Sequence, residues 1–112
     1  MRIILWLLAG LVLGGRLYHG ATGIAGELGH IQVRPEGAVC RCGNRGCLET
    51  VASTGALLTL LRPTHGPDLT LRDLLDLVDA GDLPARRVVN DAGRAVGRAV
   101  ADLCNFLNPA AV

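Results

Sequence analysis

The sequence has no lysine and very few aromatic side chains. All eleven basic residues are arginine, against ten acidic residues, and the formal net charge is +1. This balance provides neither a field that would draw in nucleic acid nor a basic block suited to a membrane surface. With only Trp6, Tyr18 and Phe106 as aromatic residues, the core has to be built from Leu, Val, Ile and Ala.

The chain also lacks an apolar run long enough to cross a membrane, which takes about 20 residues. Its most apolar stretch runs from Ile3 to Leu13. Arg2 before that run resembles a secretory signal, but no small-x-small cleavage site follows it. We favour a buried strand or hairpin, which Gly14-Gly15 turns into a second strand at Arg16–Tyr18.

What remains is a 112-residue chain, half of it hydrophobic, with a mean hydropathy of +0.38. The length allows one domain, and the composition excludes disorder. So apolar a chain either buries surface in a partner or is one piece of a larger protein. Three parts can be distinguished: a β-like, glycine-rich part (1–39), a cysteine loop (40–49) and a helical part (50–112).

Local signals place elements within these parts. We expect a loop at Gly20–Gly26, and a short strand at Ile31–Val33 closed by a turn at Arg34–Gly37. Thr70, with Asp73 three residues on, indicates an N-cap for a helix that begins at Leu71. Helical spacing predicts three helices, at Glu49–Leu61 (stopped before Pro63), Leu71 to about Ala80, and about Pro84 to Leu107. The chain is therefore α/β.

Three cysteines fall within eight residues, as Cys40-x-Cys42-x4-Cys47. Cys40 and Cys42 are too close to be comfortable disulfide partners, whereas thiolates on a glycine-rich loop can converge on one ion. Zinc takes four nitrogen or sulfur ligands, and His30 is the natural fourth member. We favour a structural zinc site; free or paired thiols in a secreted disulfide protein are the alternative.

The remaining candidates are weaker. His19 lies in the expected second strand and His65 in a Pro/Gly turn. Cys104 lies inside the third helix, where a free cysteine behaves as a small hydrophobe. Upstream, Glu27-Leu28-Gly29-His30 places a carboxylate three residues before the predicted ligand, either to bind a polyhydroxylated ligand or to steady His30.

Together, these two elements resemble a known family. The run Gly20-x-x-Gly23-x-Ala25-Gly26-Glu27-Leu28-Gly29-His30, followed by Cys40-x-Cys42-Gly43-Asn44-Arg45-Gly46-Cys47-Leu48-Glu49, is similar to the ROK family of repressors, open reading frames and sugar kinases. The resemblance extends from about Ala9 to Val112. It implies a partial actin-like, ribonuclease-H-like fold, truncated to the carboxy-terminal part of such a protein.

The resemblance also implies roles for individual residues. Positions matching His30, Cys40, Cys42 and Cys47 bind structural zinc in the family, and those matching Glu27, His30 and Glu49 contact sugar hydroxyls. His30 would then have one ring nitrogen on zinc and the other toward the sugar. Glu49 also stands in the first turn of a helix, where the dipole favours a carboxylate whatever its function.

Two features of the family's kinases are not matched. Asn90-Asp91-Ala92 resembles the motif of their catalytic base, but it lies downstream inside a predicted helix, so we interpret Asp91 as a solvated residue. Leu5–Ala9 stands where a Gly-Thr-Gly phosphate loop is expected. We therefore expect no catalysis by this chain alone, and ATP with Mg²⁺ only if the full-length parent is a kinase.

The parent is accordingly expected to be a sugar-responsive transcriptional regulator, with an ATP-dependent hexose or amino-sugar kinase as the alternative. The cysteine motif Val39–Thr50 and the arginine- and alanine-rich third helix are more like the regulators. We expect a hexose or amino sugar as ligand, no nucleic acid or membrane contact through this segment, a homo-oligomeric parent, and a cytoplasmic location.

Overall fold

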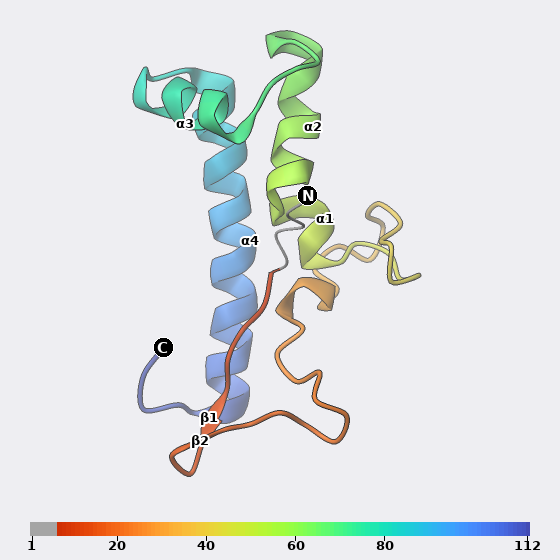
Figure 1. The fold of residues 1–112 in the computed structure, drawn as a ribbon, viewed down its shortest axis with the longest axis vertical. Helices are drawn as coiled ribbons and strands as arrows, with labels where there is room; N and C mark the ends of the chain where they lie inside the picture. Colours follow the sequence, from red (N-terminus) through yellow and green to blue (C-terminus); the bar gives the residue numbers. More distant parts are fainter. Residues whose placement is uncertain (1–6) are drawn as a thin grey trace.

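The computed structural model describes residues 7–112, which form a small α/β unit with principal extents of 47 × 32 × 30 Å (Figure 1). A long helix, α4, runs along the longest axis with α2 beside it, and α3 lies across their upper end. The lower half contains the end of α4, the hairpin, the 3-10 turn and the loops that join them. The elements are β1 (Val12–Leu13), β2 (Arg16–Leu17), the 3-10 turn η1 (Leu28–His30), α1 (Leu48–Ala52), α2 (Thr54–His65), α3 (Leu71–Asp79) and α4 (Leu83–Leu107).

The predicted hairpin is present but not buried. Val12 pairs with Leu17 and Leu13 with Arg16, around Gly14 and Gly15 with φ of 58° and 77°. Positive φ at both residues of a two-residue loop is characteristic of a type I′ turn, whose backbone twist matches that of the two strands it joins. The expected burial is wrong, because Val12 is 68% and Leu17 is 55% exposed on a short arm at the lower end of the molecule. The part of the apolar run from Ile3 to Trp6 lies outside the described residues.

The expected strand at Ile31–Val33 does not form. Gln32 makes only an isolated antiparallel bridge to Cys47. The turn after it is confirmed, since the Gly37 amide donates to the Arg34 carbonyl at 2.9 Å. Between residues 7 and 112 the sheet is therefore limited to β1 and β2.

The first predicted helix is two helices, so the described part of the chain has four α-helices where we expected three. Ser53 (φ −69°, ψ 153°) breaks the chain between α1 and α2, and its hydroxyl accepts from the Ala56 amide as an N-cap. The helix also continues past Pro63 to His65. A proline so close to a helix end removes only one backbone hydrogen bond, and the Thr64 hydroxyl donates to the Leu61 carbonyl in the same turn.

The other two helices agree with the prediction. Thr70 and Asp73 form the capping box of α3. Asp82 caps α4 through the Ala85 amide, and α4 ends at Asn108 in a left-handed conformation with φ 47°. No helix within residues 7–112 is long and apolar enough to span a bilayer.

Two hydrophobic clusters lie along α4. The upper cluster joins α2, α3 and α4, and consists of Leu58, Leu61, Leu69, Leu74 and Ala85. The lower cluster joins η1, α1 and α4 through Leu28, Leu48 and Ala99. The buried residues of α4 are alanines seven positions apart, Ala85, Ala92 and Ala99, which lets the other elements approach its axis closely. The lower cluster supports the segment that contains the predicted metal ligands.

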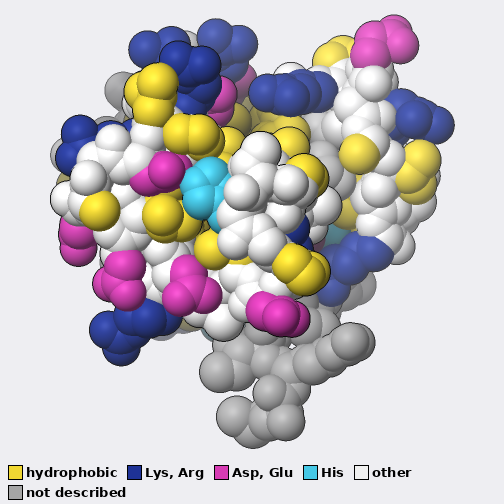
Figure 2. Space-filling model, turned by 90° about the horizontal axis from the view of Figure 1, so that it is seen from above, with side chains coloured by type: hydrophobic (Ala, Val, Ile, Leu, Met, Phe, Trp, Pro, Cys, Tyr) yellow, Lys and Arg dark blue, Asp and Glu magenta, His cyan; other side chains and the backbone are white. Residues whose placement is uncertain are grey.

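Seen from the α2–α3 end, the surface has arginines and acidic residues on the same face (Figure 2). This mixture agrees with the near-neutral charge of the sequence.

Candidate metal and sugar site

The backbone of the loop at residues 40–49 is folded tightly by its own hydrogen bonds. The Cys40 amide donates to the Asn44 carbonyl at 2.7 Å, and the Gly46 amide donates to Ala38 at 2.8 Å. Gly46 has φ +70°, and a Cβ there would collide with the Arg34 carbonyl oxygen. Glycine at 46 thus permits the close approach that turns the chain inward just before Cys47.

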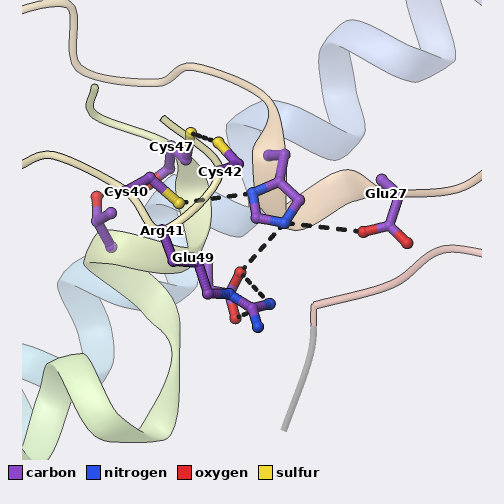
Figure 3. Close-up of polar contacts among 8 residues, drawn as sticks. Glu27, Cys40, Arg41, Cys42, Cys47 and Glu49 are labelled. Atoms are coloured by element: carbon purple, nitrogen blue, oxygen red, sulfur yellow. Dashed lines mark hydrogen bonds and ion pairs between the residues drawn. The ribbon is translucent and has the colours of Figure 1, made fainter. Parts of the chain in front are cut away.

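This folding brings the four predicted ligands together (Figure 3). One donor atom from each of His30, Cys40, Cys42 and Cys47 lies within 4.8 Å of the other three. The Cys42 and Cys47 sulfurs are 3.6 Å apart, and the Cys40 sulfur is 3.5 Å from His30 Nδ1.

These separations fit one metal ion. Around tetrahedral zinc, with Zn–S about 2.3 Å and Zn–N about 2.0 Å, neighbouring sulfurs lie about 3.8 Å apart and a sulfur lies about 3.5 Å from the nitrogen. The Cys42–Cys47 and Cys40–His30 separations are close to the edges of such a tetrahedron. Three sulfurs and one imidazole nitrogen form the donor set of a closed, structural zinc site.

The thiols of Cys42 and Cys47 differ in environment. Cys47 is fully buried, and burial raises the pKa of its thiol to about 12. Cys42 is exposed, and a hydrogen bond from the Asn44 backbone lowers the pKa of its thiol. Cys104 is half-buried on α4 and is not a member of the cluster.

The alternative histidines are also not members of the cluster. His65 lies in the last turn of α2 rather than in a turn beyond it, and its Nε2 is 3.1 Å from the Asp82 carboxylate. His19 follows β2 rather than lying in it. Of the three histidines, the structure places only His30 against the cysteines.

The second ring nitrogen of His30 faces the two glutamates. Nε2 is 3.6 Å from the Glu49 carboxylate and 3.9 Å from that of Glu27. Glu49, in the first turn of α1, also lines a hollow of about 550 Å³ between α1, α2 and α4, whereas Glu27 lines a smaller hollow of about 150 Å³. The structure thus brings the other two predicted sugar-contacting residues, Glu27 and Glu49, beside the imidazole of His30.

Sequence reasoning missed one residue of this site, Arg41. Its guanidinium Nη2 donates to both oxygens of Glu49, at 3.0 and 3.1 Å. The available signal was the position of Arg41 between two predicted cysteine ligands, in a motif that ends with Glu49. Asp91, in contrast, is exposed on α4, in agreement with its interpretation as a solvated residue.

Comparison with known proteins places this site in a family. The ROK family model matches residues 8–112, and the chain belongs to the ROK family. Members of this family have an actin-like fold, of which the described α/β unit is a part.

The relatives include both regulators and kinases. The N-acetylglucosamine repressor of Escherichia coli O6:H1 is 38% identical over 110 residues, covering 90% of this chain and 27% of the repressor. A glucokinase of Halalkalibacterium halodurans is 42% identical over 116 residues, covering 89% of this chain and 35% of the enzyme. The crystal structure of a ROK hexokinase from Thermus thermophilus superimposes with a TM-score of 0.80 at 41% identity, over 89% of this chain and 35% of that one. The chain thus spans about a third or less of the length of these proteins.

Proposed function

We propose that this chain is the zinc- and sugar-binding part of a ROK protein. One observation carries the proposal: His30 lies in one cluster with three cysteine sulfurs, its Nδ1 beside that of Cys40, while its Nε2 faces two carboxylates. A single side chain would thereby join a metal site to a site for a hydroxylated ligand.

The metal part follows from the donor set. His30, Cys40, Cys42 and Cys47 would hold zinc with no position left open, so that the ion, when bound, acts by fixing the fold. With Nδ1 on the metal, the imidazole carries its proton on Nε2. His30 is then a fixed hydrogen-bond donor directed toward Glu27 and Glu49.

The sugar part follows from the distances. Separations of 3.6 and 3.9 Å from Nε2 to the glutamates exceed those of a direct hydrogen bond. A ligand hydroxyl between them would accept from Nε2 and donate to a carboxylate. Adjacent hydroxyls of a hexose or amino sugar supply such groups, which agrees with the sugars in the names of the relatives.

For the parent protein, we propose a sugar-responsive transcriptional regulator with a homo-oligomeric, cytoplasmic form. Support comes from the repressor among the relatives, together with the resemblance of the cysteine motif and of the arginine- and alanine-rich α4 sequence to the regulators. The second candidate is an ATP- and Mg²⁺-dependent sugar kinase, favoured by the 42% identity to a glucokinase.

Metal analysis and thermal unfolding test the binding proposal. We expect about one zinc per chain and a rise in melting temperature with D-glucose or N-acetyl-D-glucosamine. Glu27→Ala should abolish that rise, whereas Glu36→Ala, an exposed glutamate in the Arg34–Gly37 turn, should keep it. Purified protein with no zinc and a Cys40–Cys47 disulfide would refute the metal site. ATP-dependent phosphorylation of either sugar by these 112 residues would favour the kinase.

A further inference from the structure

We propose that Arg41 is a positioning residue, which links the metal loop (residues 40–47) to the carboxylate of Glu49 at the start of α1 and so keeps that carboxylate in place for the sugar. The inference rests on the proposed function. It starts from the position of Arg41 in the chain, directly between the ligands Cys40 and Cys42.

The contact itself is well defined. Arg41 Nη2 lies 3.0 and 3.1 Å from the two oxygens of Glu49, whose side chain is only 12% exposed (Figure 3). A carboxylate that has lost most of its water needs charged or polar partners, and a charge-assisted contact is among the strongest. His30 Nε2 lies 3.6 Å from the same carboxylate. Glu49 is therefore flanked by His30, a proposed zinc ligand, and by Arg41, whose two neighbours in the sequence are also proposed ligands.

Metal binding restricts Arg41 through its neighbours. When the sulfurs of Cys40 and Cys42 share one ion, the backbone of the residue between them is held at both sides. Without the ion, the bonds that close this turn are those between Cys40 and its neighbours Gly43 and Asn44. The arginine then samples more conformations, and its contact with Glu49 becomes entropically more costly.

Two consequences follow for binding. Metal at the cysteines should strengthen sugar binding at Glu49, and by thermodynamic reciprocity the sugar should strengthen retention of the metal. Arg45 supplies a matched control, because it lies in the same loop but donates to the Gly37 carbonyl, at 3.3 Å, instead of to Glu49.

The test is a double-mutant cycle on zinc release from the loaded chain to a chromogenic chelator. Because the Arg41 side chain is 41% exposed, we expect Arg41→Ala and Glu49→Gln each to speed release by about twofold to fivefold. The double variant should be no faster than either single variant. Arg41→Lys should restore part of the loss, and Arg45→Ala should behave as wild type.

The sugar response supplies a readout that a purely structural arginine would not change. With zinc still at one per chain, Arg41→Ala should lose most of the melting-temperature rise given by N-acetyl-D-glucosamine. Release at the wild-type rate from Arg41→Ala, or multiplicative effects in the double variant, would overturn the link. A wild-type chain without any sugar response would instead overturn the sugar-binding function, while the release cycle still decides whether Arg41 and Glu49 act together.

Discussion

Removal of the metal should loosen one end of the molecule and leave the other end folded. The loop around the ligands is closed by a few backbone hydrogen bonds, among them those donated by Cys40, Gly46 and Leu48 at 2.7 to 2.8 Å. The upper cluster contains no residue of the segment 27–49, and it is built from α2, α3, α4 and the α2–α3 connection. We therefore expect chelation to release the loop without unfolding these helices.

The size of the effect follows from mass action. At free zinc 1,000 times its dissociation constant, the bound state gains about 4 kcal/mol, so the amides of Cys40, Gly46 and Leu48 should exchange about 1,000-fold faster after chelation. Hydrogen exchange followed by mass spectrometry measures this directly. The Leu74 amide, bonded to the Thr70 carbonyl in the upper cluster, should change little.

The control for this experiment is Cys104→Ala, which alters the cysteine that lies apart from the other three and should preserve the zinc-dependent protection. Equal acceleration at Leu74 and Gly46 would show that the chain unfolds as one unit. No acceleration at Gly46 would show that the metal does not hold the loop. Either result would refute the reasoning.

Two further predictions concern stability. Leu61→Ala removes a side chain that is 2% exposed and should cost about 2–5 kcal/mol in urea unfolding, whereas Leu60→Ala, at a position 63% exposed, should cost less than about 0.5 kcal/mol. Hydrogen bonds from Thr70 lower the pKa of Asp73, and those from Ala85 and His65 lower that of Asp82, below the ordinary value of 3.8. The stability that these two ionised carboxylates give the folded state is present above pH 3.8 and is lost as the pH falls through their lowered pKa values. Asp73→Asn should therefore make acid unfolding less steep. An unchanged acid transition would contradict this.

Much of the site could be predicted because its signals are local. The close spacing of three cysteines with glycines between them indicates a loop that can surround an ion, and the structure brings Cys40, Cys42 and Cys47 together with His30. The Thr70 cap is equally local, because a side chain three residues from its partner amide needs no tertiary contact. Zinc itself and the sugar stay predictions.

The misses depend on long-range packing or on competing local signals. Apolar residues keep helical spacing across Ser53, so the pattern alone does not show that its hydroxyl begins a new helix. The exposure of Val12 and Leu17 depends on whether the hairpin packs against the helices. The alternation of side chains along a strand does not contain this information. In the sequence, Arg41 is indistinguishable from a solvated arginine in a loop. Its role becomes visible only in the structure, where α1 places Glu49 beside it.

The lower cluster has a consequence for the order of folding. It joins Leu28 with Ala99, whereas the contacts of α3 with α4 are between neighbours in sequence. Because closing a long stretch of chain costs more entropy than closing a short one, contacts between residues about 70 positions apart form late. We expect α3 and α4 to pair first and η1 to dock on α4 last. His30 and the three cysteines are only 10 to 17 positions apart, so they can meet earlier. Capture of the ion would then assemble this loop segment before it docks on the long helix.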